Sequence, residues 1–174
     1  MAKALFDGIV ETDYGQFDLL WRNGLGFDGD FDRFFAGQVN GLVGAGDPEG
    51  VYMHFGRRSG GSRVRIERCD AQPPLENQWE DIVEVSIAIP LGADPRWESW
   101  ACDTSGPLGP IPAGTYRIRV SEKGRDEGHD SEFADGIVDS YLIQMWPAPP
   151  VPDAVIRVGS ADAEYWHKEI GGRR

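Results

Sequence analysis

Cysteine and histidine are scarce in this sequence, and their scarcity limits the chemistry that it can support. The 174 residues include only two cysteines, Cys69 and Cys102, and three histidines. The cysteines form no CxxC pair, so neither a metal site nor thiol redox chemistry is indicated, and we expect no cofactor. The sequence leaves open whether the two cysteines pair with each other. The simplest expectation is two reduced, buried thiols.

Long apolar runs are also missing. No run approaches the roughly 20 residues that a membrane-spanning helix needs. The N-terminal segment MAKALFDGIVETD has no long apolar stretch and carries acidic residues early, which is unlike a secretory signal peptide. We therefore expect a cytoplasmic protein that does not bind membranes.

Positive charge is in short supply as well. There are 17 lysines and arginines against 29 aspartates and glutamates, so the formal net charge is -12 at pH 7. A surface of this kind repels nucleic acids and anionic membranes, which argues against a DNA- or RNA-binding role. It attracts a basic partner instead. The competing explanation is that the acidity only confers solubility.

Glycine and proline, by contrast, are plentiful. The 23 glycines and 12 prolines are spread between short apolar runs, and no amphipathic helix of normal length is present. This pattern predicts an all-β fold, an antiparallel β-sandwich of about eight or nine strands with long loops and at most short helices. We assign residues 1–150 to the sandwich domain. Residues 151–174 form a C-terminal strand and tail, packed on the same domain or trailing from it.

The most regular stretch runs from Ile111 to Pro147. Tyr116, Ile118 and Val120 alternate with polar residues, as in a half-buried strand. The segment from Ile137 to Met145 is largely apolar on both faces, which favours a more central strand. We predict that the two strands form a long antiparallel hairpin in the middle of the sandwich.

Smaller features predict further elements. The pair Gly60–Gly61 lies between two strand patterns and predicts a hairpin turn. Ser160 is a candidate N-cap for a short helix from Ala161 to Ile170, with a frayed tail as the alternative. The irregular segment 23–50 contains either a weak strand or a short helix around residues 31–35. We expect an aromatic satellite cluster beneath it, formed by Phe27, Phe31, Phe34 and Phe35.

The loop of the predicted hairpin is strongly acidic. Its carboxylates surround His129, an arrangement that can serve acid–base chemistry or hold a metal. A mobile loop lacks the rigid frame that both need, so docking of a basic protein is the preferred interpretation. We predict no catalytic residue here and assign partner binding to Asp126, Glu127, Asp130, Glu132 and Asp135.

Six tryptophans offer a second kind of surface. Trp21 and Trp146 lie in strong strand patterns and are expected in the core. Trp97 and Trp100 lie in a loop-rich segment. If both are exposed, they are the best aromatic candidates for binding a carbohydrate or another small ligand.

The alternating acids Asp28, Asp30 and Asp32 resemble the start of a calcium-binding loop. The rest of the pattern fails, because Arg33 stands where glycine is needed and Val39 stands where a bidentate glutamate is needed. We assign no metal ligand. Whether this loop or the loop at 126–135 takes up calcium stays open.

Tyr14-Gly15-Gln16-Phe17 stands at the start of an early strand and is the first of several short blocks. It is similar to the Tyr-x-Gln-Phe of the competence protein J family. The segment from Gly24 to Pro48 and the tail after Pro150 look like additions to the family pattern. The other blocks follow in the family's order and are Val51–Phe55, Val83–Pro90, Pro112–Tyr116 and Asp139–Ile143.

Members of the competence protein J family are small bacterial inhibitors of a DNA-entry nuclease. The resemblance therefore implies a compact all-β binding protein that acts by occlusion and not by catalysis. An acidic inhibitor suits a nuclease, because a surface that receives phosphates is basic.

Our leading hypothesis is a non-catalytic acidic protein that inhibits, or confers immunity to, a nuclease or another basic protein. The alternative is a carbohydrate- or small-ligand-binding sandwich that uses exposed tryptophans. An enzyme ranks last, since the GxSxG motif is absent and no histidine stands in a known nucleophile setting. The oligomeric state is not indicated by the sequence.

Overall fold

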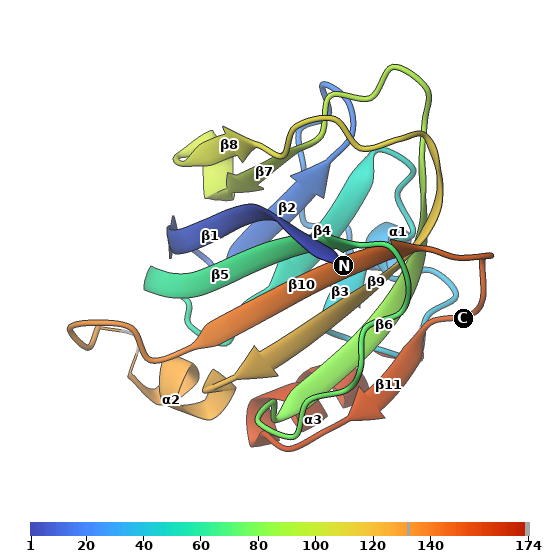
Figure 1. Cartoon of the computed structure of the whole chain (residues 1–174). Helices are drawn as coiled ribbons and strands as arrows, with labels where there is room; N and C mark the ends of the chain where they lie inside the picture. The colour runs from blue at the N-terminus through green and yellow to red at the C-terminus, as the bar shows by residue number, and fades with distance from the viewer. Residues whose placement is uncertain (132, 173–174) are drawn as a thin grey trace.

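In a computed structural model that describes residues 1–131 and 133–172, the chain forms two packed β-sheets. Figure 1 shows the sheets one behind the other, with the helices at their margins. The all-β sandwich predicted from the sequence is therefore confirmed. The described residues form eleven strands, more than the eight or nine expected, because β3 and β8 have only two and three residues and show no periodicity.

The larger sheet has six strands in the order β1-β5-β10-β9-β6-β11. All neighbours are antiparallel except β10 and β5, which run parallel. The predicted hairpin is confirmed. Strands β9 and β10 pair from Tyr116 opposite Pro147 to Lys123 opposite Ser140, and they are the two central strands of this sheet. The strands are β1 (Ala2–Thr12), β5 (Gly60–Cys69), β6 (Asp81–Ile89), β9 (Gly114–Lys123), β10 (Ser140–Pro147) and β11 (Ala154–Arg157).

The smaller sheet has five antiparallel strands in the order β3-β4-β2-β7-β8. Short helices lie around the two sheets, and η1 is a single 3-10 turn. The strands are β2 (Gln16–Leu20), β3 (Val43–Gly44), β4 (Gly50–His54), β7 (Arg96–Ser99) and β8 (Ser105–Pro107). The helical segments are α1 (Phe31–Phe34), η1 (Trp100–Cys102), α2 (Arg125–Asp130) and α3 (Ala161–Glu169).

The core lies between the sheets and follows from the period-two patterns. Tyr116, Ile118 and Val120 are buried in it, as predicted for the inner face of β9. Trp21 also belongs to the core, whereas Trp146 is buried on the outer face of the larger sheet beneath the Arg119 guanidinium. The expected phenylalanine cluster forms around Tyr52 and includes Phe27, Phe31, Phe34 and Phe35.

The predicted hairpin at Gly60–Gly61 is wrong. Strand β4 belongs to the smaller sheet and β5 to the larger one, so residues 56–59 carry the chain from one sheet to the other. We call this segment the crossover. The Gly56 amide donates to the Tyr141 hydroxyl at 2.8 Å, which ties the crossover to the central strand β10. A left-handed Gly60 (φ 125°) permits the turn, but the sequence does not say which sheet the next strand joins.

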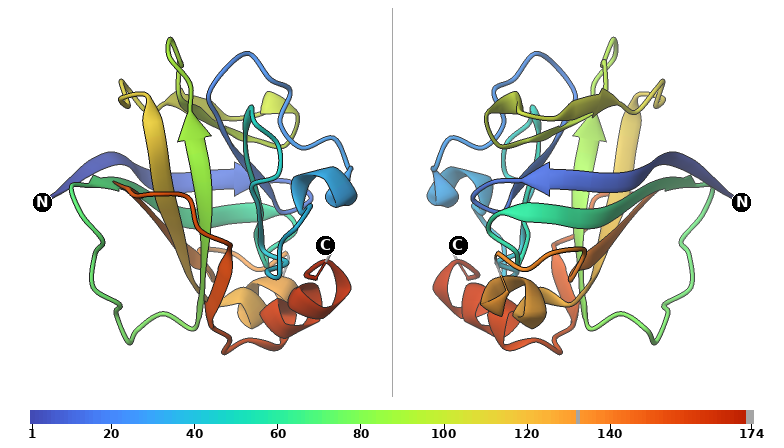
Figure 2. Two further views of the ribbon diagram at one scale, coloured as in Figure 1. Left: turned by 90° about the vertical axis from the view of Figure 1, so that its right-hand side faces the viewer. Right: turned by 90° about the vertical axis from the view of Figure 1, so that its left-hand side faces the viewer.

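The C-terminal elements predicted from the sequence are both present. Strand β11 pairs with β6 at the edge of the larger sheet. The Ser160 hydroxyl accepts a hydrogen bond from the Ala163 amide at 3.1 Å and so caps α3, which ends at Glu169. In both views of Figure 2, α3 lies beside α2 at one end of the sandwich.

Both cysteines are free, but only Cys69 is buried. Cys102 is exposed because it ends the 3-10 turn η1 at the surface, so the expectation of two buried thiols is wrong for this residue. Within the described chain no helix is long and apolar enough to span a membrane, and the longest, α3, has nine residues.

The loop after β2 covers a carboxyl group on the outer face of the smaller sheet. Asp18 is only 1% exposed. It accepts hydrogen bonds from the Gln16 side chain at 2.7 Å and from the Phe27 amide at 3.1 Å. Gly26 has a φ of 72°, and a Cβ atom there would lie 2.7 Å from the Asp18 carboxylate. Only glycine therefore lets the loop approach Asp18 this closely. Burial raises the pKa of Asp18 to about 7, with Glu98 adding to the effect and the two hydrogen bonds opposing it.

This raised pKa predicts a specific pH dependence of stability. Because the folded pKa lies above the ordinary value of 3.8, Asp18 binds its proton more tightly in the folded chain, and stability is lost as pH rises towards 7. Asp18→Asn removes this loss. Between pH 5 and pH 8, the unfolding free energy of the variant relative to the parent should rise by on the order of 2 kcal/mol in urea titrations. A difference that is flat with pH would show that Asp18 titrates normally.

Candidate protein-binding surface

The predicted acidic loop lies at the end of the β9–β10 hairpin, and part of it is helical. Its first half forms helix α2, and the chain then passes over the end of the sandwich to reach β10 at Ser140 (Figure 1). The second predicted strand thus begins at Ser140 and not at Ile137. Two buried arginines, Arg125 and Arg57, hold the two halves of the loop in place.

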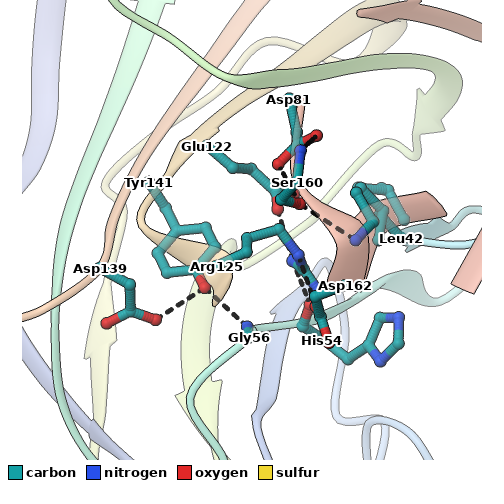
Figure 3. Close-up of polar contacts among 12 residues, drawn as sticks. Leu42, His54, Gly56, Asp81, Glu122, Arg125, Asp139, Tyr141, Ser160 and Asp162 are labelled. Carbon is teal, nitrogen blue, oxygen red and sulfur yellow. Dashed lines mark hydrogen bonds and ion pairs between the residues drawn. The ribbon is translucent and has the colours of Figure 1, made fainter. Parts of the chain in front are cut away.

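Arg125 anchors the beginning of α2. Its guanidinium is fully buried and is surrounded by acceptors from three elements (Figure 3). It donates to Glu122 on β9, to the His54 carbonyl on β4 at 2.9 Å, and to Asp162 on α3 at 2.9 Å. Burial raises the pKa of Glu122, and the neighbouring Arg125 charge opposes that rise. The first residue of α2 is therefore fixed to both sheets and to α3.

Asp126 has a structural role of its own. Its two carboxylate oxygens accept hydrogen bonds from the Ala161 amide at 3.0 Å and the Asp162 amide at 2.8 Å. These are first-turn amides of α3, which have no partner inside that helix. A carboxylate there is also favourable for the helix dipole. Asp126 therefore joins α2 to α3, and most of its hydrogen-bonding capacity faces inward.

Arg57, in the crossover, anchors the second half of the loop. It is 3% exposed and donates to the Ala134 carbonyl, to the Gly136 carbonyl at 2.7 Å and to the Gly61 carbonyl at 3.0 Å. Further along, the Asp139 carboxylate accepts from the Tyr141 hydroxyl at 2.7 Å. The loop is held at both ends by buried hydrogen bonds, so the residues between them are presented on a fixed base.

Between these anchors, the structure leaves an aromatic ring exposed on the same loop as several carboxylates. Phe133 is 88% exposed, and Glu127, Asp130 and Asp135 are exposed on the same loop. We call these four residues the acidic tip. Glu132 lies outside the described residues. Of the five predicted binding residues, three are thus exposed in the acidic tip, and Asp126 serves mainly to hold the loop.

His129 lies at the surface of α2, next to Asp162. Its side chain is 68% exposed, and its Nδ1 atom lies 3.7 Å from Asp162, the carboxylate that already pairs with Arg125. General acid–base catalysis needs a base within hydrogen-bonding reach of a substrate in a defined pocket. An imidazole exposed to this degree lies at the surface of the protein.

The two tryptophans of the alternative ligand site differ in their exposure to solvent. Trp97 is 7% exposed, because β7 pairs with β2 and directs it into the core against Phe6 and Phe17. Trp100 is 41% exposed on η1, with its ring centroid 5.0 Å from that of Tyr14. A platform made of both tryptophans does not form.

The alternating acids of the 28–32 segment surround an arginine. Arg33 pairs with Asp28 at 2.6 Å, with Asp30 at 3.7 Å and with Asp47. Asp30 also caps α1 by accepting from the Arg33 amide at 3.0 Å. Across the part of the chain that the structure describes, no three His, Cys, Asp or Glu side chains are grouped as metal ligands.

Sequence reasoning missed three residues of this surface. Phe133 had a usable signal, since it is the single aromatic residue in an acidic run. The anchors Arg125 and Arg57 had none, because an arginine in a polar turn is normally solvated. Their acceptors come from segments up to 79 residues away.

The fold is similar to two solved structures. One is the crystal structure of ComJ, inhibitor of the DNA degrading activity of NucA, from Bacillus subtilis, with a TM-score of 0.58 and 17% identity over 85% of this chain and 99% of that one. The other is the crocagin biosynthetic gene J protein, with a TM-score of 0.55 and 15% identity over 86% of this chain and 99% of that one. No family model and no curated protein match the sequence. The resemblance to the competence protein J family is thus confirmed at the level of the fold.

Proposed function

We propose that this protein is a non-catalytic inhibitor or immunity factor that binds a basic protein, in the first place a nuclease, through its acidic tip. The observation that carries the proposal is that Phe133 is exposed on the same anchored loop as the exposed acids Glu127, Asp130 and Asp135. Its fold, shared with an inhibitor of a DNA-degrading activity, supports the nuclease as the first partner to test.

The acidic tip combines two contributions to binding. Its carboxylates attract a basic surface and raise the rate of encounter, an effect that salt screens. The Phe133 ring supplies apolar area that is buried only when a partner covers it, and buried aromatic anchors dominate the affinity of many interfaces. Arg125 holds the start of α2 and Arg57 holds Ala134 and Gly136, so these positions need little further ordering on binding.

The mechanism that follows is occlusion. A nuclease surface that accepts the phosphates of DNA is basic, and carboxylates placed there compete with the substrate. No group of the inhibitor needs to react. The carbohydrate-binding alternative is weakened, because Trp97 lies in the core and only Trp100 reaches the surface.

Neutralising the acidic tip should weaken partner binding. In the triple variant Glu127→Gln, Asp130→Asn, Asp135→Asn, we expect the association rate to fall by about tenfold at low salt, with a flatter salt dependence. The measurement begins with capture from a host lysate on the immobilised parent chain and elution from about 50 to about 500 mM salt. The eluted protein must be basic, and its DNA-degrading activity must be blocked by the parent chain in a stoichiometric titration.

The matched control neutralises three exposed acids elsewhere, Asp70→Asn, Glu76→Gln and Asp94→Asn, and so has the same net charge. This control should associate at nearly the rate of the parent chain. Equal losses in both triple variants would mean that only total charge matters, and the assignment to the acidic tip would be wrong. Recovery of no basic protein would contradict the proposed function itself.

The Phe133 ring should act mainly on the dissociation rate. Phe133→Ala is expected to weaken binding by about tenfold or more while changing the unfolding free energy by less than about 0.5 kcal/mol, because the ring is solvated in the free chain. Leu91→Ala is a close control, since Leu91 is likewise 88% exposed. Surface plasmon resonance and urea unfolding separate the two effects. An unchanged dissociation rate in Phe133→Ala would remove the ring from the interface.

Asp126 and Glu127 should behave differently although they are adjacent acids. Asp126→Ala leaves two first-turn amides of α3 without their acceptor, so we expect a loss of about 1 kcal/mol in unfolding free energy. Glu127→Ala should change stability by less than about 0.5 kcal/mol, because Glu127 is exposed. Urea unfolding of both variants tests this contrast. Equal stabilities would show that the Asp126 contacts to α3 contribute nothing measurable.

A further inference from the structure

The sequence contains three asparagines, and two of them precede a glycine. In an asparagine–glycine pair, the backbone nitrogen of the glycine can attack the side-chain carbonyl carbon of the asparagine, because glycine has no Cβ atom to hinder the approach. The three asparagines with the residues that follow them are Asn23–Gly24, Asn40–Gly41 and Asn77–Gln78. The fold decides which of the two asparagine–glycine pairs is open to this reaction.

The pair Asn40–Gly41 is closed to it. Asn40 is fully buried, its Nδ2 atom donates to Asp153 at 2.8 Å, and its Oδ1 atom accepts from two backbone amides at 3.0 and 2.8 Å. The Gly41 amide donates to the His167 Nδ1 atom at 3.0 Å. A Cβ atom at Gly41 would lie 1.9 Å from the Trp166 carbonyl oxygen, so packing alone requires glycine here. Both reacting groups of this pair are therefore occupied.

The pair Asn23–Gly24 is open. Asn23 is exposed in the loop after β2 and lines two surface depressions, so water reaches its side chain. Within the part of the chain that the structure describes, neither its side-chain amide nor the Gly24 amide has a hydrogen-bonding partner. The φ of Gly24 lies outside the left-handed region, and a Cβ atom there would meet Glu49 at 3.5 Å and Leu20 at 3.9 Å, which are ordinary contacts. Packing therefore does not require glycine at position 24.

One arginine holds the backbone on both sides of this pair. Arg96 on β7 donates to the Arg22 carbonyl and, at 3.0 Å, to the Gly24 carbonyl. Further along the same loop, the Phe27 amide donates to the buried Asp18 carboxylate at 3.1 Å. These contacts depend on the length of backbone between them. A longer backbone at position 23 would therefore displace the loop from the sheet that it covers.

We propose that Asn23 is a site of deamidation and isomerisation, and that its isoaspartyl product loosens the loop that covers Asp18. The Gly24 amide loses its proton to solvent base, and its nitrogen forms a bond to the Asn23 Cγ atom. The Cγ–Nδ2 bond breaks, and Nδ2 takes up a proton and leaves as ammonia. Water then opens the resulting succinimide at either carbonyl and gives aspartate or isoaspartate. No oxidant or reductant is needed.

Isoaspartate changes the loop in two ways. The backbone then runs through the former side chain, which inserts one methylene between the two carbonyls that Arg96 holds. The product also carries a new carboxylate in the depression that Arg96 lines. Because a guanidinium binds a carboxylate more strongly than a neutral carbonyl, this group competes with both carbonyls for Arg96. Ordinary aspartate adds the charge without the methylene.

The first test is ageing of the folded chain in mildly alkaline buffer, with peptide mapping by mass spectrometry at intervals. Asn23 should deamidate at least about tenfold faster than the buried Asn40 and than Asn77, which is exposed but precedes glutamine. In urea, Asn40 should react as fast as Asn23, because only the folded structure protects it. Gly24→Ala should slow the reaction at Asn23 by about tenfold or more. Equal rates at Asn23 and Asn77 in the folded chain, or no reaction at Asn23, would overturn the site.

The second test is hydrogen exchange at the Phe27 amide, which measures the hold on the loop. After an isoaspartate-specific methyltransferase has confirmed the product, this amide should exchange at least about threefold faster in the aged chain than in the fresh chain. Asn23→Asp should show a smaller increase, since it adds only the charge. Gly24→Ala aged in parallel should keep the fresh rate, which controls for changes at other positions. An unchanged rate in the aged parent chain would overturn the effect on the loop.

Discussion

The buried guanidinium of Arg125 joins elements that apolar packing alone does not bring together. It links β9, β4 and α3 through Glu122, the His54 carbonyl and Asp162. A buried ion pair adds little net stability compared with a well-packed apolar core, but removal of one partner leaves an uncompensated charge and typically costs about 3 to 5 kcal/mol. The main role of this network is therefore to position the elements that it joins. It fixes where α2 starts, and α2 together with the loop that follows determines where Phe133 and the exposed carboxylates stand.

The other buried arginines also connect separate parts of the fold. Among the described residues, the buried basic side chains are Arg57, Arg117, Arg119 and Arg125. Arg117 and Arg119 both pair with Glu84 on β6, and their remaining N–H groups donate to carbonyls of covering loops. Arginine suits this use because its rigid fork satisfies several acceptors at once. These buried cations therefore hold strands, loops and helices together through acceptors of the protein itself.

The sequence predicted the parts of the fold that depend on local periodicity. The strands β6, β9 and β10 and the capped helix α3 follow from alternation and from Ser160. Helix α2 escaped notice because its six residues, RDEGHD, carry no apolar stripe, and its stability comes from Arg125 and Asp126. The same limit applies to the two tryptophans. They are three residues apart, and only the pairing of β7 with β2 decides that one is in the core and the other at the surface.

The crossover at residues 56–59 contributes to the position of the acidic tip. Its two arginines contact different segments: Arg57 donates to the loop after α2, while Arg58 lies over the Tyr14 ring in the turn before β2. The Gly15 amide donates to the Arg58 carbonyl at 2.8 Å, so the strained turn at Tyr14 is also held by this segment. Had β4 and β5 formed the hairpin that Gly60–Gly61 indicated, both arginines would stand in a solvated turn. Because the chain instead changes sheets there, four consecutive residues contact both the loop after α2 and the turn before β2. A change in the crossover should therefore disturb both segments together, whereas a change at Phe133 acts on the acidic tip alone.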